Sequence, residues 1–292
     1  MTTLAAPTCE FTFTEEHFRA IARLAHENFG LDLQPEKRAL VYSRLTRRLR
    51  ALQLSDFDAY LGRLAGPESA DEHAELLSAL TTNVTHFFRE AHHFDEFRDK
   101  VLPGAIAEAR AGGRIRFWSA GCSAGQEPYS IALTILDTCP DAASLDIRIL
   151  ATDVDPRILE TARTAVYPIE ERNALPPRLR DKMTVVGTGP NSFTVRQEAR
   201  DLVRFGELNL IKDWPLRGPF QAVFCRNVAI YFDKPTQARL WRRFAPLIAP
   251  GGMLFIGHSE RLSGPATEMF RSAGITSYQR LVDQTAGPEA IS

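Results

Sequence analysis

The stretch FQAVFCRNVAIYF, residues 220–232, decides the predicted fold. Its apolar run Ala222–Cys225 predicts a buried β-strand, which ends at the polar pair Arg226 and Asn227. Ligands of open α/β sheets bind outside the carboxyl ends of the strands, so this pair and the nearby hydroxyl of Tyr231 are candidates for a site. The alternative is a strand end that carries a solvated Arg–Asn pair.

Strands and helices alternate on both sides of this stretch. We expect strands at 114–119, 147–152, 222–225 and 253–256, with helices between them at 126–136, 156–165 and 234–247. This alternation predicts an α/β domain with a doubly wound, Rossmann-like parallel sheet. Between about 167 and 206 the alternation breaks, and MTVVGTGPNSFTVRQ predicts a hairpin, so we expect a small antiparallel β insert there.

The N-terminal part of the chain predicts helices only. We expect helices to start at Thr14, at Pro35, at Ser55 or Asp56, and at about Asp71. The chain therefore divides into an all-helical N-terminal domain, residues 1–80, and an α/β domain, residues 81–292.

Composition narrows the class of protein. A hydrophobic content of 44% and a charged content of 24% are ordinary for a globular protein. The net charge of −1 gives no general attraction to nucleic acid or to an anionic membrane. The four cysteines are widely spaced, so we expect reduced thiols, and no apolar run or signal segment predicts membrane insertion or export. We expect a cytoplasmic monomer.

The first strand of the α/β domain leads into SAGCSAGQEPYSIAL, residues 119–133. Its small residues let a ligand approach the backbone where the strand turns into a helix. Glu127 lies in the first helical turn, where an acid usually stabilises the helix dipole. A carboxylate there disfavours a pyrophosphate and favours a cofactor with a cationic part, such as the sulfonium of S-adenosylmethionine.

The second strand ends in LATDVDP, which offers two acids. An acid at this position accepts hydrogen bonds from ribose hydroxyls, or caps the helix that begins at Pro156. We assign Asp153 to the ligand and Asp155 to the cap.

A third polar segment, LTTNVTHFFREAHHF, spans residues 80–94. Asn83, Thr85 and Arg89 are candidates for the site, although Asn83 or Thr85 could instead cap a helix that contains Arg89. The adjacent His92 and His93 have no partner ligands at metal spacing in the sequence, so we expect no metal.

Five motifs in order carry a family resemblance: TNVTHFFRE, WSAGCSAGQEPYSIAL, ATDVDPRIL, FCRNVAIYFDKPTQ and APGGMLFIGHSE. With them the chain resembles the CheR-type chemotaxis receptor methyltransferases over nearly its whole length. The resemblance implies a class I methyltransferase fold that uses S-adenosylmethionine and releases S-adenosylhomocysteine. It also implies methyl esterification of glutamate side chains on the cytoplasmic helices of chemoreceptors.

The resemblance also implies site residues by matching position. The cofactor pocket would be lined by Asn83, Thr85, Arg89, Glu127, Asp153, Asn209, Leu210 and Arg226. Arg226 and Tyr231 would border the pocket near the transferred methyl group. Two departures are visible, because Gln126 replaces a common acid and Ala229 replaces a larger apolar residue, but neither removes a matched ligand.

The chemistry of this reaction explains why the motifs hold no nucleophile–base pair. A glutamate acceptor is already ionised near neutral pH, so alignment and exclusion of water can supply most of the catalysis. We expect Arg89 to orient a carboxylate of the acceptor or cofactor and Tyr231 to position the reacting groups. Arg226 would hold its loop against the ligand.

The predicted second helix is strongly basic. One arc of it carries Lys37, Arg44, Arg47 and Arg48 beside an apolar stripe. The arc is either an ordinary solvated face or, next to a methyltransferase with acidic substrate helices, a docking surface for the receptor.

The insert offers a second contact with a receptor. GTGP, residues 187–190, matches the loop by which some family members bind a receptor's C-terminal peptide, but the following NSFTVRQ is shortened. Both alternatives, with and without such a peptide, stay open.

Two rival functions remain on the sequence alone. One is a receptor-binding regulatory module that binds S-adenosylmethionine with little turnover. The other is a methyltransferase for another protein or for nucleic acid, yet the chain has CRNVAIYF where an N-P-P-Y-like motif would indicate nucleic acid.

Overall fold

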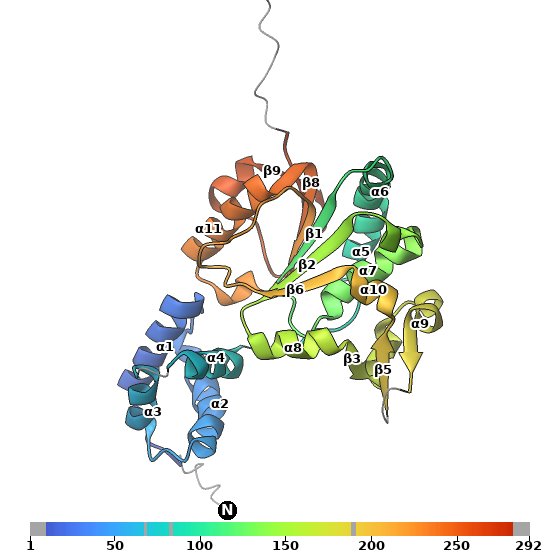
Figure 1. The fold of residues 1–292 in the computed structure, drawn as a ribbon. Helices are drawn as coiled ribbons and strands as arrows, with labels where there is room; N and C mark the ends of the chain where they lie inside the picture. The colour runs from blue at the N-terminus through green and yellow to red at the C-terminus, as the bar shows by residue number, and fades with distance from the viewer. Residues whose placement is uncertain (1–9, 67–68, 82–83, 188–190, 283–292) are drawn as a thin grey trace, which may run out of the picture. The chain divides into compact units, whose positions relative to one another are not determined.

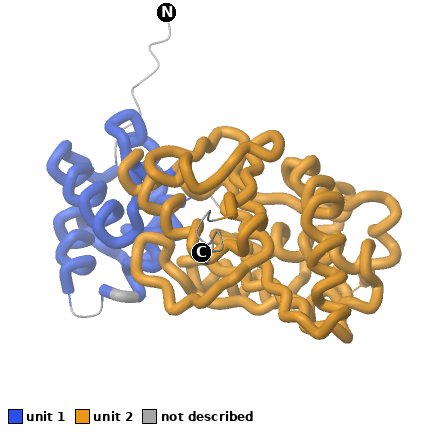
Figure 2. Tube along the Cα trace, turned by 90° about the horizontal axis from the view of Figure 1, so that it is seen from above, with its two compact units in different colours: residues 1–82, 231–233 blue, residues 83–230, 234–292 orange. Residues whose placement is uncertain are grey.

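The computed structural model describes residues 10–66, 69–81, 84–187 and 191–282 (Figure 1). The chain forms two compact units, each defined by the contacts within it (Figure 2). Unit 1 comprises residues 1–82 and 231–233, and unit 2 comprises residues 83–230 and 234–292.

In its described residues unit 1 contains four α-helices, as the sequence predicts. They are α1 (Glu15–Phe29), α2 (Arg38–Ala51), α3 (Phe57–Leu64) and α4 (Ser69–Leu80), with a 3-10 turn η1 (Pro35–Lys37) before α2. Thr14 begins α1 through a capping box with His17, and Asp56 caps α3 by accepting a hydrogen bond from the backbone N–H of Ala59 at 2.8 Å. The proline predicted to open the second helix therefore lies in the preceding 3-10 turn.

Each helix of unit 1 buries an apolar stripe in a common core. Ile21, Leu45, Tyr60 and Leu76 have no exposed surface, and they come from four different helices. Burial of this kind, rather than helix propensity, supplies most of the stability of such short helices.

Unit 2 is centred on a seven-stranded sheet in the order β6-β2-β1-β7-β8-β10-β9 (Figure 1). Its strands are β1 (Ile115–Ala120), β2 (Ile147–Asp153), β6 (Val203–Glu207), β7 (Phe220–Cys225), β8 (Ile248–Ile256), β9 (Phe270–Gly274) and β10 (Ser277–Arg280). The first five in this order are parallel, whereas β10 and β9 add an antiparallel edge. The predicted doubly wound sheet is confirmed.

Helices cover both faces of the sheet. Phe117 and Trp118 are neighbours on β1, so their side chains point to opposite faces. Phe97 packs edge-on against Phe117 at 4.9 Å between ring centroids, and Phe244 packs against Trp118 at 5.2 Å. The segments that carry Phe97 and Phe244 therefore lie on opposite sides of β1.

The helical segments of unit 2 follow the predicted alternation closely. They are α5 (His92–Glu96), a π-helical segment η2 (Phe97–Val101), α6 (Leu102–Arg110), α7 (Gln126–Thr138), α8 (Pro156–Thr164), α9 (Pro177–Met183), α10 (Gln197–Asp201) and α11 (Lys234–Phe244), with 3-10 turns η3 (Ala142–Ser144), η4 (Ile169–Ala174), η5 (Ala229–Tyr231), η6 (Ala245–Leu247) and η7 (Gly264–Glu268). In the part of the chain that is described, no helix is both long and apolar enough to span a bilayer.

The predicted insert is a separate three-stranded sheet in the order β3-β5-β4. Antiparallel pairing joins β3 (Val166–Pro168), β5 (Ser192–Val195) and β4 (Thr184–Val186), which confirms the hairpin. The expected C-terminal bound at about residue 206 falls within β6 (Val203–Glu207), which belongs to the main sheet and pairs with β2. The alternation in VRFGE is too short and too polar to indicate a sheet strand.

Candidate functional site

The candidate site lies where the order of the sheet reverses. From β1 the chain crosses to β2 on one side, whereas β7, the other neighbour of β1, leads on to β8. The loops that follow β1 and β7 therefore meet at the switch point. Gly121 has φ +84°, and a Cβ on it would lie 2.4 Å from Cγ2 of Val228, so a glycine is required for this approach.

Glu127 is held at the switch point by two partners. Its Oε1 accepts a hydrogen bond of 2.7 Å from the Ser119 hydroxyl at the end of β1, and its Oε2 lies 3.1 Å from Nη1 of Arg226. Burial raises the pKa of Glu127 above its usual value, although Arg226 and Ser119 act against the shift. The loops after β1 and β7 are thus joined by one carboxylate.

Arg226 is the centre of a buried ion-pair network. Only 2% of its side chain is exposed, and its Nη2 lies 3.3 Å from Oε2 of Glu90 and donates to the carbonyl of Arg89. Its guanidinium also lies 5.6 Å from the centroid of the Phe94 ring. Arg226 therefore connects Glu127 to the segment of Arg89 and Glu90, a role that the sequence does not reveal.

Asp153 stands at the carboxyl end of β2, beside the turn after β1. Its Oδ2 accepts a hydrogen bond of 2.8 Å from the backbone N–H of Ser123, and its Oδ1 accepts one of 3.1 Å from Asp155. Burial raises the pKa of Asp153, against the lowering effect of these N–H groups. Asp155 caps α8 by accepting a hydrogen bond from the N–H of Arg157 at 2.9 Å, as predicted.

Asn209 and Leu210 follow the adjacent strand β6. The loop that holds them begins beside Asp153, because the N–H of Leu208 donates to the Asp153 carbonyl at 2.9 Å. The Asn209 side chain accepts a hydrogen bond from the N–H of Ile211 at 3.0 Å, and Leu210 is buried. Three of the predicted cofactor residues, Asp153, Asn209 and Leu210, therefore share one edge of the sheet.

The segment before α5 holds the next candidates. Asn83 lies outside the described residues, and Thr85 is partly buried. Arg89 lies in a turn rather than in a helix, which corrects the capping alternative, and its Nη1 donates to the Val84 carbonyl at 3.2 Å. Positive φ values at Phe88 and Glu90, +53° and +54°, break any helix across this segment.

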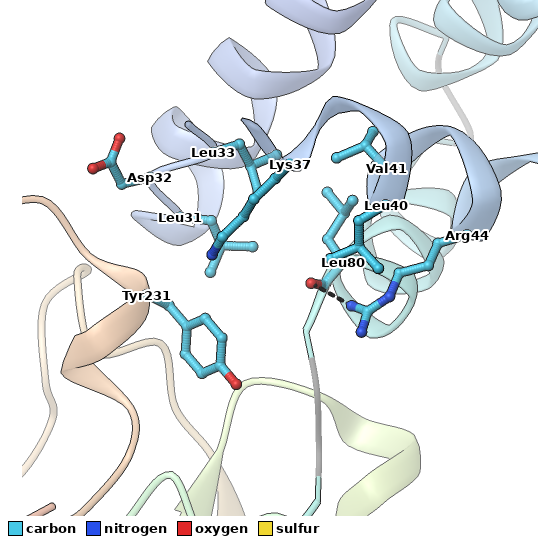
Figure 3. A pocket seen from close by; sticks show the side chains of 9 residues that line it. All are labelled: Leu31, Asp32, Leu33, Lys37, Leu40, Val41, Arg44, Leu80 and Tyr231. Atoms are coloured by element: carbon cyan, nitrogen blue, oxygen red, sulfur yellow. Dashed lines mark hydrogen bonds between the residues drawn. The ribbon is translucent and has the colours of Figure 1, made fainter. Parts of the chain in front are cut away.

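Tyr231 has its main contacts in unit 1. The N–H of Asp32 donates to the Tyr231 carbonyl at 2.7 Å, and Tyr231 lines a pocket of about 420 Å³, part of which is open solvent. In Figure 3 the Lys37 ammonium and the Tyr231 ring point into this pocket, and the Asp32 carboxylate points away. The remaining lining residues are mostly apolar: Leu31, Leu33, Leu40, Val41, Leu80 and Arg44.

The predicted basic arc of α2 divides into two groups. Arg48 binds Glu72 at 2.7 Å and Glu75 at 3.1 Å, and Arg44 donates to the carbonyl of Leu80 at 2.8 Å at the end of α4 (Figure 3). These two arginines hold α2 to α4. Lys37 and Arg47 show no such structural pairing within the described residues, and Arg47 is exposed.

A histidine cluster lies beside Arg226. Ligand atoms of Glu90, His92 and His93 lie within 4.8 Å of one another, so the expectation that the two histidines lack a nearby ligand partner is wrong. Burial and Arg226 lower the pKa of His93 to about 3, and Arg226 with His258 outweighs burial to lower that of Glu90 to about 2. A metal ion here would compete with the Arg226 guanidinium for Glu90.

The loop from Arg226 to Tyr231, called the motif loop below, is held by an acid that the sequence analysis did not select. Glu260 is 4% exposed and accepts backbone hydrogen bonds from this loop. The signal in the sequence is its position, since Glu260 ends the last of the quoted motifs, GHSE.

The donor set at the switch point fits S-adenosylmethionine. Carboxylates such as Asp153 and Glu127 can accept hydrogen bonds from ribose hydroxyls and an ammonium group. Glu127 is held by Ser119 near the end of β1, and Asp153 by the N–H of Ser123 in the turn that follows, so both lie at the same part of the sheet edge. Their negative charge suits a cationic donor better than a pyrophosphate.

Comparison with known proteins agrees with this chemistry. Residues 16–81 match the family model "CheR methyltransferase, all-alpha domain", and residues 83–279 match "CheR methyltransferase, SAM binding domain". A probable chemotaxis protein methyltransferase of Rhizobium etli is 48% identical over 258 residues, which cover 88% of this chain and 96% of the relative. The chemotaxis protein methyltransferase of Salmonella typhimurium is 43% identical over 274 residues, covering 93% of this chain and 92% of the relative. The chain belongs to the CheR family and is an S-adenosylmethionine-dependent methyltransferase.

Proposed function

We propose that this enzyme methylates glutamate side chains of chemoreceptors and forms methyl esters. The observation that carries the proposal is a pair of acids beside the turn after β1: Asp153 accepts from the Ser123 N–H, and Glu127 is bound by Ser119 and by Arg226 of the motif loop. The names of its relatives, which are chemotaxis protein methyltransferases, point to the same substrate class. Because such receptors present their methylated helices to the cytoplasm, the enzyme acts there.

On the cofactor side, the chain's residues bind and orient. When bound, S-adenosylmethionine supplies a methyl group activated by a sulfonium leaving group. Asp153 and Glu127 accept hydrogen bonds from its ribose and amino groups, with Asn209 and Leu210 beside them. Thr85 and Arg89 contribute from the segment before α5, where Arg89 can pair with a carboxylate, and Asn83 is included by its motif position.

Arg226 supports the ligand indirectly, without being placed among these contacts. With 2% of its side chain exposed and both Glu127 and Glu90 as partners, it keeps the Glu127 carboxylate ionised and oriented. It therefore supports the ligand through Glu127 and by holding the motif loop.

On the acceptor side, the glutamate needs no general base because it is ionised near neutral pH. Tyr231 positions the reacting groups with its hydroxyl. Its pocket supports an acidic helical substrate, since the Lys37 ammonium points into apolar surroundings that suit the stem of such a side chain (Figure 3). Arg47 adds exposed positive charge on helix α2, which follows the turn of Lys37, and steers the receptor by its charge.

The insert supports a second receptor contact. β4 is an edge strand of the three-stranded sheet, and its Val185 and Val186 are exposed, so a receptor peptide can pair with this edge. Residues 188–190 of the quoted loop lie outside the described part of the chain. The test compares methylation rates for receptors with and without their C-terminal peptide. A faster rate with the peptide would indicate the tethered mode, and equal rates would indicate the untethered mode.

The decisive test is the chemical nature of the product. The enzyme is incubated with S-adenosylmethionine tritiated in the methyl group and with receptor-containing membranes, and the protein fraction is treated with base. We expect volatile tritiated methanol, because methyl esters hydrolyse in base. Base-stable label would instead identify a methylated amine or nucleobase and would overturn the proposal. Binding of S-adenosylhomocysteine without any label transfer would indicate a regulatory module.

A further inference from the structure

Glu260 is a buried acid whose carboxylate is surrounded by backbone N–H groups. Its oxygens accept hydrogen bonds from Asn227 at 3.1 Å, Val228 at 3.1 Å and Ile230 at 3.2 Å, and from Gly257 at 2.5 Å. Three of the four donors belong to the motif loop. A carboxylate with several such bonds is among the strongest local constraints that a side chain can place on a backbone.

The motif loop adopts a conformation that needs this constraint. Asn227 has φ +60°, in the left-handed region that most residues avoid. The N–H groups of Asn227, Val228 and Ile230 all point to one carboxylate, and without an anion they would face one another as unpaired donors. The loop therefore keeps its shape because Glu260 supplies the negative charge at its centre.

The position of Glu260 is itself fixed by the sheet. Its N–H donates to the carbonyl of Gly257 at 2.9 Å, directly after β8, and Cys225 pairs with Ile256 where β7 and β8 end. A Cβ on Gly257 would lie 2.8 Å from the backbone N of Asn227, so the two turns are packed backbone to backbone. The ends of two neighbouring strands are thus joined by one side chain.

The motif loop connects two residues with different proposed roles. Arg226 begins this loop and binds Glu127, and Tyr231 ends it and lines the Lys37 pocket. Five residues of chain span at most ~18 Å, so this loop is a short covalent link between the residue that binds Glu127 and the residue assigned to the acceptor.

We propose that Glu260 is a positioning residue for methyl transfer: it clamps the motif loop and so sets the acceptor side of the site without contacting the cofactor. The inference rests on the proposed function, which assigns Tyr231 to the acceptor. It predicts that loss of the carboxylate lowers turnover and leaves the affinity for the cofactor product nearly unchanged.

Three variants test the clamp. Glu260→Gln keeps the size of the side chain but replaces an acceptor oxygen by an NH₂ group, which cannot accept from the loop. Glu260→Asp keeps the charge on a shorter stem. Glu268→Gln, at an exposed acid of the same C-terminal region, is the matched control.

The first readout is amide hydrogen exchange of the peptide that covers residues 226–231, which needs no substrate. We expect Glu260→Gln to speed this exchange by about tenfold or more, equivalent to ~1.4 kcal/mol, with the helices of unit 2 unaffected. Glu260→Asp should fall between wild type and Glu260→Gln, and Glu268→Gln should match wild type. Unchanged exchange in Glu260→Gln would overturn the clamp.

The second readout separates positioning from a merely structural role. For Glu260→Gln we expect kcat for receptor methylation to fall by about tenfold or more, while Kd for S-adenosylhomocysteine stays within about threefold. Faster loop exchange with an unchanged kcat would overturn the positioning role. So would faster exchange throughout unit 2 with a parallel loss of affinity for S-adenosylhomocysteine. If wild type methylated no receptor, the proposed function would fail, and the exchange rates alone would then support or overturn the clamp.

Discussion

Arg226 of unit 2 and Arg48 of unit 1 each lie between two acids, but in different surroundings. The Arg226 side chain is 2% exposed and lies between Glu127 and Glu90. Arg48 of α2 is 23% exposed and lies between Glu72 and Glu75. Both are held by two acids, yet one pair of acids stands at the ligand edge of a sheet and the other joins two helices.

The difference teaches that a cation's function depends on the position of its acids rather than on its own sequence pattern. Glu127, in the first turn of α7, is held by Ser119 at the end of β1, where an ionised group can meet a ligand. Glu72, with 1% of its side chain exposed, lies inside a helical unit, and its neighbours among the described residues include Arg48, Arg63 and Tyr60. The same type of ion pair therefore lies at the proposed binding site in one unit and joins packed helices in the other.

The largest expected effect comes from removing the shared cation of unit 2. Arg226→Ala leaves Glu127 and Glu90 buried without their partner, and breaking such a pair typically costs ~3–5 kcal/mol. We expect the free energy of unfolding, measured by urea denaturation, to fall by about this amount, and receptor methylation to be lost. Arg226→Lys restores one charge without the two-sided geometry and should recover stability only in part. A variant as stable as wild type would contradict the network.

Arg48→Ala is the corresponding change in unit 1. It leaves Glu72 buried with Arg63 as its remaining cation, at 3.5 Å. Because Arg48 is partly exposed and Arg63 remains, we expect a smaller loss of unfolding free energy, ~1–3 kcal/mol. The affinity for S-adenosylhomocysteine, measured by calorimetry, should stay unchanged. A loss of that affinity at full stability would mean that α2 serves the ligand directly, and the comparison would fail.

At Glu127, ligand affinity and the free energy of unfolding should change in opposite directions with pH. Burial raises its pKa in the folded protein above the ordinary 4.5, so the folded protein binds a proton at a higher pH than the unfolded chain. As pH falls through this window, its contribution to the free energy of unfolding rises. Affinity for S-adenosylhomocysteine should fall in the same window, because the ionised form binds the ligand.

Calorimetry and urea denaturation across pH measure these opposite trends. Glu127→Gln should lose about tenfold in affinity at neutral pH, ~1.4 kcal/mol, and should flatten the pH dependence of both quantities. Affinity that follows stability in the same direction would remove Glu127 from the ligand.

The sequence predicts the strand ends and caps of the site better than it predicts which distant side chains contact one another there. The strand ends at Asp153 and Arg226 and the cap at Asp155 follow from apolar runs and local spacing, which depend on near neighbours in the chain. The Arg226–Glu127 contact joins residues 99 positions apart, and Glu260 reaches the motif loop from 30 to 33 positions away. Such partners depend on strand order, which periodicity does not determine.

The same limit explains two further differences. The side chains of Lys37 and Arg48 are equivalent in a helical projection, but Arg48 meets acids of α4 and Lys37 does not. The strand β6 was missed because its residues alternate only weakly, and its place is determined by pairing with β2. In both cases a neighbour from another element decides the outcome.

The smallest expected effect sharpens the comparison within the basic segment formed by η1 and α2. Lys37→Glu and Arg47→Glu reverse charges that hold no structural ion pair in the described part of unit 1, so unfolding free energy should change by less than ~0.5 kcal/mol each. We expect receptor methylation to fall about threefold at low salt, mainly through kcat/KM, because charge steering is weakened. At high salt, variant and wild type should converge, because screening removes the steering in both. Arg47→Gln, which removes the charge without reversing it, is the matched control and should lose less than Arg47→Glu. Equal methylation at every salt concentration would leave this face of α2 without a role in binding the receptor, since the structural group, Arg44 and Arg48, is already engaged with α4.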